Sequence, residues 1–138
     1  MILAAFDAMR DARRRRLWAP DLAAGRRGED LAHRYLRKQG YVIVARNYRL
    51  SNGEAEADLI ARDGEDLAIV EVKTRATDEY GPPERAVNPD KQRHLIRVAR
   101  EYARKSGTPW EHVRFDVVSI VMGDPPRISL MRGAFQAR

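Results

Sequence analysis

The chain has 138 residues, of which 43% are hydrophobic and 33% are charged, and it contains no cysteine. This length and composition predict a single folded domain, and the lack of cysteine excludes disulfides, thiolate metal sites and cysteine nucleophiles. The formal net charge is +6, and residues 1–50 hold 12 Lys and Arg against 5 Asp and Glu. Such a positive balance suits binding to nucleic acid or to an anionic membrane surface, and it also serves plain solubility.

The N-terminal segment, residues 1–20, is predicted to be a basic arm ahead of a single domain at 21–138. It contains four consecutive arginines at 13–16 and ends in WAPD, which is typical of a boundary between a helical or loosely held arm and a folded domain. Apolar residues precede the arginines, the reverse of the order in a secretory signal, and no apolar run approaches the roughly 18 residues of a membrane span. The sequence therefore predicts a cytoplasmic protein with no membrane span.

Two amphipathic segments predict helices. The first covers about residues 22–39, with Asp21 as its N-cap and Gly40 just beyond its C-terminal end. The second covers residues 90–105 and is predicted to be capped by Asp90. Its arginines recur at helical spacing and form a basic stripe: Arg93, Arg97, Arg100 and Arg104.

Segments rich in β-branched and aromatic residues predict five strands. They cover residues 41–50, 56–62, 67–75, 113–122 and 127–131. Three prolines and a glycine make most of 76–90 a loop. The order of helix, three strands, loop, helix and two strands predicts a mixed α/β or α+β domain with one central sheet.

The hairpin predicted for residues 56–75 carries acidic residues on both of its strands. A four-residue loop at 63–66, or a two-residue turn at 64–65, places Asp58 directly opposite Glu71. A turn at 63–64 would instead make the two residues diagonal neighbours. In each register the two carboxylates converge.

Strand alternation adds a lysine to this acidic pair. Glu71 and Lys73 share one face of their strand, whereas Val70 and Val72 point the other way, toward the core. Glu56 is also expected on the acidic side. Two carboxylates that face each other on a sheet repel, and the repulsion grows as they are buried.

A hard divalent cation would relieve this repulsion. Mg²⁺ accepts one or two carboxylates, keeps several waters and bridges to phosphate oxygens. Lys73 beside such an ion could orient a water nucleophile or stabilise negative charge on a phosphate. The alternative is that Lys73 simply pairs with the acids in a solvated lattice of salt bridges, which is common at the edges of sheets.

Several segments together resemble the YraN family of bacterial proteins, UPF0102: GRRGEDLAHRYLRKQGY, RNYRL, EADLIARDGEDLAIVEVKTR, a later helix led by a lysine, and RFDVVSI. That family is similar to the PD-(D/E)XK nucleases, with archaeal Holliday-junction resolvases among its nearest relatives. The resemblance implies a restriction-endonuclease-like core, a mixed sheet flanked by helices, and phosphodiester hydrolysis that depends on Mg²⁺ or Mn²⁺.

The resemblance also assigns roles to individual residues. Asp58 corresponds to the first metal-binding acid, Glu71 and Lys73 correspond to the E-x-K motif, and Glu29 matches an acid that resolvase-like members bring from the first helix. The backbone carbonyl of Val72 is expected within reach of the metal. The family usually has Gly-Glu-x-Asp-Leu where this chain has GEAEADL. Either Glu54 or Glu56 is therefore the family glutamate, and the spacing to Asp58 favours Glu56.

Basic residues around the hairpin are expected to contact nucleic acid. They lie on the strand before the hairpin, at its end and on the second helix: Arg46, Arg49, Arg75, Lys91, Arg93 and Arg97. The three histidines have no zinc-ligand spacing, although His33 lies four residues after Glu29 and could join the site. Asp116 is expected to have a structural or supporting role, with a metal ligand as the alternative.

The predicted function is a metal-dependent endonuclease that cuts DNA, with branched or structured DNA as its expected target. The alternatives are a nucleic-acid-binding module with little or no catalysis on the same fold, and an interaction protein that acts through its arginine-rich arm. Since nuclease relatives often work as two-fold dimers, the resemblance also implies a homodimer.

Overall fold

The computed structural model describes residues 19–76 and 87–137, with side chains of the first helix described from Gly25 onward. Most of the predicted arm at 1–20 and of the predicted loop at 76–90 lies outside the described residues. The described elements are α2 (Ala19–Lys38), β1 (Val42–Arg49), β2 (Glu56–Asp63), β3 (Asp66–Arg75), α3 (Pro89–Ser106), the short 3-10 helix η2 (Trp110–His112), β4 (Val113–Val121) and β5 (Arg127–Phe135).

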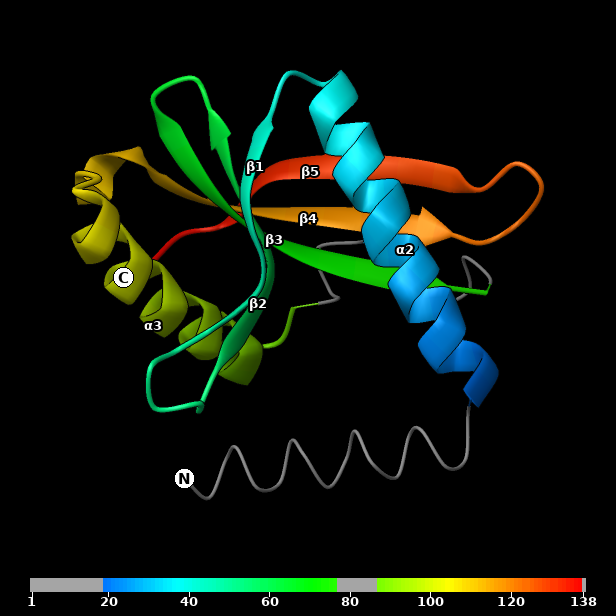
Figure 1. Cartoon of the computed structure of the whole chain (residues 1–138), viewed down its shortest axis with the longest axis horizontal. Coiled ribbons are helices and arrows are strands. Elements are labelled where there is room, and N and C mark those ends of the chain that lie inside the picture. Colours follow the sequence, from blue (N-terminus) through cyan, green and yellow to red (C-terminus); the bar gives the residue numbers. More distant parts are fainter. Residues whose placement is uncertain (1–18, 77–86, 138) are drawn as a thin grey trace.

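The five strands form one mixed sheet in the order β1-β2-β3-β4-β5. Neighbouring strands are antiparallel except β3 and β4, which run parallel because α3 lies between them in the chain. Helices α2 and α3 cover opposite faces of the sheet (Figure 1). The predicted mixed α/β fold with one central sheet is confirmed, and the architecture agrees with a restriction-endonuclease-like core.

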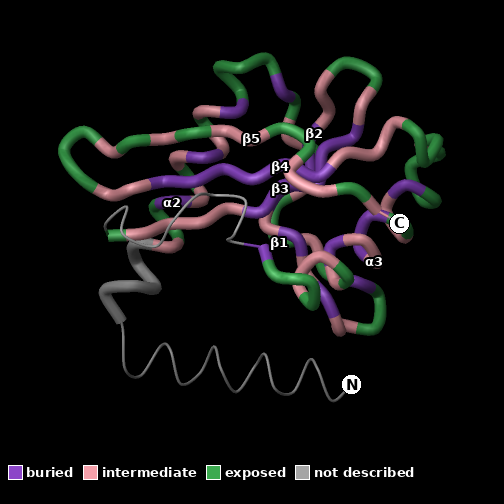
Figure 2. Tube along the Cα trace, turned by 180° about the vertical axis from the view of Figure 1, so that it is seen from behind, coloured by how far each residue is buried: buried purple, intermediate pink, exposed green. Residues whose placement is uncertain are grey.

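The core consists of two hydrophobic layers, one on each face of the sheet. Ala32 and Leu36 of α2 pack in the first layer with side chains of β2, β3 and β4. Leu95 and Val98 of α3 pack in the second layer. Among the described residues, the central strands β3 and β4 are accordingly the most buried (Figure 2). The long helices of the described ranges are α2 and α3, and neither is apolar enough to span a membrane.

The helix starts differ from the sequence prediction. Helix α2 begins at Ala19, so Asp21 lies within the helix and is not its N-cap. Helix α3 is capped by Asn88, whose side chain accepts a hydrogen bond from the backbone N–H of Lys91 at 2.9 Å. Asp90 is therefore in the first turn and is not the cap, because Pro89 fits the first helical position, where no backbone donor is needed. Gly40, with a φ of 94°, ends α2 as predicted.

Strand β5 is longer than predicted, since it continues to Phe135 rather than ending at 131. Gly133 has a φ of 61°, and the pairing of β4 with β5 shifts register between Phe115 and Val117. A glycine at such an irregularity accommodates a bulge. The strand therefore passes through Gly133.

The β2–β3 hairpin has the register that brings its acids together. Asp63 pairs with Asp66, so the turn contains only Gly64 and Glu65, and Gly64 takes a φ of 61°. Leu59 pairs with Val70 in the same register. The predicted two-residue turn is confirmed, and the shifted turn at 63–64 is excluded.

Helix α2 crosses strand β3 very closely at Gly28. A Cβ atom built on Gly28 would lie 1.9 Å from Thr74 Oγ1, 3.1 Å from Thr74 Cβ and 3.2 Å from Thr74 Cγ2. Rotation of Thr74 would therefore not relieve the clash. The glycine allows the helix to lie against the strand, and it fixes the position of Glu29, the next residue.

Gly28→Ala is expected to lower the free energy of unfolding by about 1–3 kcal/mol, the usual cost of overpacking. Urea denaturation measures the change. Gly25→Ala is the matched control, because nothing lies within 4 Å of its Cβ position, and alanine within a helix should be neutral or stabilise by up to about 1 kcal/mol. Thr74→Ala should recover part of the loss in the double variant. Equal stability of the two alanine variants would contradict the close contact.

Candidate functional site

The acids of the hairpin meet at the end opposite its turn. Continuing the ladder one step beyond Leu59 and Val70 aligns Asp58 with Glu71. Asp58 Oδ2 accepts a hydrogen bond from the backbone N–H of Val72 at 2.8 Å. This bond ties the Asp58 carboxylate to strand β3 next to Glu71. The main chain of the two strands thus sets the separation of the two acids.

Glu71 is buried with one of its carboxylate oxygens unpartnered. The residue is only 6% exposed, and its Oε2 atom has no hydrogen-bond partner. Burial, followed by the negative charge of Asp58, raises the pKa of Glu71 to about 8. A carboxylate that is desolvated and repelled in this way is a ready ligand for a cation.

Two lysines approach this buried carboxylate. Because Glu71 alternates with Val70, it lies on the face of the sheet that α3 covers, and Lys91 Nζ is 3.5 Å from Glu71 Oε2. Lys73, two residues along β3, is half-buried, and its positive charge also acts on Glu71. The predicted cluster of Asp58, Glu71 and Lys73 is therefore brought together.

Glu29 reaches the same region from α2. Burial and then the charge of Asp58 raise the pKa of Glu29. Arg46 on β1 partly offsets this, with its Nη2 atom 3.7 Å from Glu29 Oε2. The structure thus places the helix acid within electrostatic reach of the hairpin acids.

The two alternatives for the family glutamate lie in different surroundings. Glu56 pairs with Arg49 across the β1–β2 ladder at 3.2 Å, and its charge acts on both Glu29 and Lys91. Glu54 forms an ion pair with Arg97 of α3. Glu56 is therefore the one that belongs electrostatically to the acidic site.

Asp58 and Glu71 are the residues that could hold a magnesium-type ion, which keeps most of its waters. Across residues 19–76 and 87–137, no three His, Asp or Glu side chains are arranged to hold a metal. The pair Asp58 and Glu71 supplies the one or two carboxylates that Mg²⁺ usually takes. The unpartnered, buried Oε2 of Glu71 is the observation that fits a cation there.

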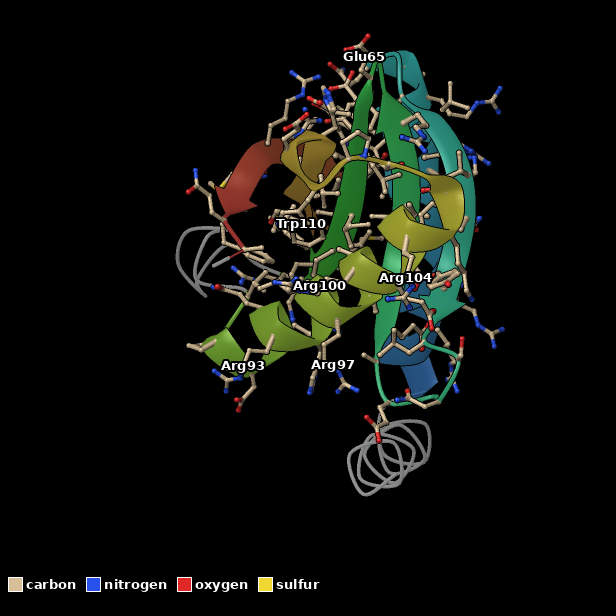
Figure 3. All side chains as sticks on the ribbon, turned by 90° about the vertical axis from the view of Figure 1, so that its left-hand side faces the viewer. Glu65, Arg93, Arg97, Arg100, Arg104 and Trp110 are labelled. Carbon is tan, nitrogen blue, oxygen red and sulfur yellow. The ribbon has the colours of Figure 1, made fainter. Side chains whose placement is uncertain are left out.

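Most of the predicted nucleic-acid contacts are engaged with carboxylates. The pairs are Arg46 with Asp30, Arg49 with Glu56, Lys91 with Glu71, Arg93 with Asp90 and Arg97 with Glu54. The backbone carbonyl of Arg75 accepts a hydrogen bond from the Met122 N–H. Figure 3 shows the basic stripe of α3, in which the guanidinium of Arg100 lies 4.8 Å from the centre of the Trp110 ring. A phosphate binding to these cations would have to replace carboxylates.

The histidines do not build a shared metal site. His112 Nδ1 lies 3.1 Å from Asp66 Oδ1 near the hairpin turn. His33 is half-buried, and its Nδ1 has no hydrogen-bond partner. Burial, followed by the positive charges of Arg46 and Arg37, lowers the pKa of His33.

Asp116 belongs to a polar network at the turn end of the hairpin. It is 1% exposed and accepts hydrogen bonds from Tyr41 Oη at 2.8 Å, Arg114 Nε at 2.9 Å and the Gly133 N–H at 3.0 Å. Arg114 also reaches Asp63 and Asp66. These saturated contacts support the structural role expected for Asp116.

Two features of the molecule were missed in the sequence. Arg114 is the centre of a polar network. The only signal of this in the sequence is its position two residues before Asp116, which puts both side chains on the same face of a strand. The contact of Lys91 with Glu71 had no local signal, because it joins residues on two elements that meet only in the folded chain.

The family model and the individual relatives that match this chain all point to the same protein family. The family model for the uncharacterised protein family UPF0102 matches residues 28–120. A UPF0102 protein of Solibacter usitatus is 53% identical over 111 residues, which cover 80% of this chain and 84% of the relative. A UPF0102 protein of Rhodococcus jostii is 50% identical over 119 residues, covering 85% of this chain and 99% of the relative. The matched stretch includes Gly28, Glu29, the hairpin and Lys91.

Proposed function

The chain belongs to the uncharacterised protein family UPF0102, and from the geometry of its acidic site we propose that it is a metal-dependent endonuclease that hydrolyses phosphodiester bonds of DNA. The single observation that carries the proposal is Glu71, which is buried against Asp58 with an unpartnered oxygen. Such a pair is unfavourable in the protein alone and becomes favourable with a divalent cation. Perturbed acids of this kind concentrate at functional sites.

Asp58 and Glu71 would hold Mg²⁺ or Mn²⁺, with the Val72 carbonyl as a backbone donor beside them and Glu29 close by. When bound, the cation supplies charge neutralisation at the phosphate and a water of lowered pKa. The hydrogen bond from the Val72 N–H to Asp58 fixes one of the two carboxylates before the substrate arrives. Preorganisation of this kind lowers the cost of assembling the reactive geometry.

Lys73 would act on the reacting phosphate. It shares the face of Glu71, so its ammonium can orient the attacking water or stabilise the negative charge that grows on the phosphate oxygens as the P–O bond breaks. The basic side chains around the site would track the DNA backbone. Arg93 and Arg97 lie along α3 (Figure 3), and phosphates that replaced their partners Asp90 and Glu54 would let the backbone follow this helix.

Cleavage assays on the purified full chain test the proposal. Four-way branched, duplex and single-stranded DNA are incubated with Mg²⁺, with Mn²⁺ or with a chelator. We expect metal-dependent cutting that slows by about a hundredfold or more in Lys73→Met, the usual cost of removing one group that stabilises transition-state charge. Lys105→Met is the control, because Lys105 pairs with Glu101 at the far end of α3. Cutting that persists unchanged in Lys73→Met would reveal a contaminant and contradict the proposal.

A nucleic-acid-binding module without catalysis is the second candidate. The observation that favours it is Lys91, which already supplies Glu71 with a positive charge that does not require metal. DNA binding without cutting in any metal, with affinity that falls steeply as salt rises, would support this candidate over the nuclease.

A further inference from the structure

Lys91 is the main counter-ion of the buried acid. Among the positive charges that act on Glu71, the charge of Lys91 has the larger effect and that of Lys73 the smaller. Arg46 pairs with Glu29 and Asp30 instead. Among the described residues, compensation of the charge on Glu71 therefore depends chiefly on one lysine.

The contact of Lys91 with Glu71 compensates charge at a distance that is long for a hydrogen bond. The Nζ to Oε2 distance is 3.5 Å, and Oε2 remains without a hydrogen-bond partner. The Lys91 side chain is 36% exposed, so its ammonium can leave for water by rotation of its own stem. The Lys91 backbone is held in place, because its N–H donates a hydrogen bond to Asn88 Oδ1. Leaving Glu71 therefore requires movement of the side chain alone.

A metal ion on Glu71 would meet this ammonium at close range. An ion about 2.1 Å from Oε2 could lie no more than about 5.6 Å from an ammonium 3.5 Å from the same oxygen. At that separation a divalent and a monovalent cation repel strongly in a partly buried site. Both cannot occupy their best positions together.

We propose that the Lys91 ammonium and the metal compete for the place beside the Glu71 carboxylate. The ammonium lies there in the metal-free protein and must swing out when a divalent cation binds. The inference rests on the proposed metal site. It makes Lys91 a positioning residue that sets the affinity for metal, whereas the sequence suggested only a phosphate contact.

Metal binding by the full chain tests this role directly. Mn²⁺ affinity is measured by titration calorimetry at pH 8.5 on chelator-treated wild type and variants. Lys91→Gln should bind Mn²⁺ about tenfold more tightly, the effect of about one pKa unit that a nearby charge typically exerts. Lys91→Arg keeps the charge and should stay close to wild type. Arg93→Gln removes the same charge from the same helix end, where Arg93 pairs with Asp90, and should also stay close to wild type.

A second measurement does not need a folded variant. The reactivity of each lysine toward an amine-acylating reagent is followed by mass spectrometry as Mn²⁺ is added to the wild type. Lys91 should become more reactive as it leaves Glu71, and Lys105 should not change. Equal Mn²⁺ affinity of wild type and Lys91→Gln, together with unchanged Lys91 reactivity, would overturn the inference and leave the metal site standing. No Mn²⁺ binding by any of the proteins would overturn the proposed metal site itself, and this inference with it.

Discussion

Glu71→Gln is expected to stabilise the metal-free protein at pH 8 by about 3 kcal/mol and to abolish its binding of Mn²⁺. Each unit by which folding raises the pKa of a carboxyl corresponds to about 1.4 kcal/mol. Burial and the charge of Asp58 raise the pKa of Glu71 from 4.5 to about 8, a net shift that already includes the opposing charge of Lys91. The cost of burying a glutamine amide in place of the carboxyl offsets part of the gain. A substitution that improves stability and removes function is the usual sign of a strained site.

The same residue gives the protein a defined dependence of stability on pH. Between pH 4.5 and about 8 the folded state holds a proton on Glu71 that the unfolded chain has released. Stability therefore falls as pH rises through this window and levels off above it. In Glu71→Gln this part of the fall should disappear.

Urea denaturation at pH 5, 6, 7 and 8, with and without Mn²⁺, measures both effects. Glu65→Gln is the matched control, because Glu65 is exposed in the hairpin turn and should change stability by less than about 0.5 kcal/mol. Mn²⁺ should stabilise the wild type and leave Glu71→Gln unchanged. A glutamine variant less stable than wild type at pH 8 would show that Glu71 is a structural acid.

Asp116→Ala is expected to cost about 3–5 kcal/mol of stability, the usual effect of removing one partner of a buried ion pair. The substitution would leave Arg114, Tyr41 and the Gly133 N–H without their shared acceptor. Asp116→Asn keeps part of the hydrogen bonding and should cost less.

Thermal and urea unfolding of the Asp116 variants give the measurement. Asp124→Ala, in the exposed turn before β5, serves as the control and should lie within about 0.5 kcal/mol of wild type. A loss below about 1 kcal/mol in Asp116→Ala would mean that the acceptors Arg114 already has besides Asp116 are enough to hold it. Those acceptors are Asp63 and Asp66.

These two predictions have opposite signs because the hairpin has two acidic ends with different surroundings. At the turn end Arg114 and Arg132 neutralise the acids, and Asp116 is fully hydrogen-bonded. At the other end Glu71 keeps an unpartnered buried oxygen. The first arrangement stabilises the fold, and the second stores repulsion that a ligand can release.

The sequence predicted the acidic pair well because its geometry is local. A turn that contains Gly64, together with the two-residue period of a strand, is enough to make Asp58 and Glu71 opposite or diagonal neighbours and to put Lys73 on the same face. No tertiary information enters that argument. The pairing of Asp63 with Asp66 in the structure then selects the opposite register. The order of elements likewise predicted one mixed sheet, since each strand pairs with its neighbour in the chain.

What the sequence could not predict depends on packing between distant elements. Lys91 meets Glu71 only because α3 folds back over the sheet, and no local pattern marks that contact. Glu29 entered the site through family resemblance, and its place is set by the close approach of Gly28 to Thr74. The cap of α3 was misassigned because Asn88 and Asp90 are both good capping residues, and Pro89 between them decides.

The two-residue turn of the β2–β3 hairpin also bears on how the chain folds. Short hairpins close in about 1–10 μs, whereas the parallel pairing of β3 with β4 must wait for the long connection through α3 to close. Asp58 and Glu71 would then meet at the start of folding, before Lys91 and Glu29 arrive. In the hairpin alone both carboxylates still face water and repel only weakly, and the burial that raises the pKa of Glu71 comes later, when the rest of the fold closes over the hairpin. The cost of the acidic pair therefore falls on the last steps of folding rather than on the first.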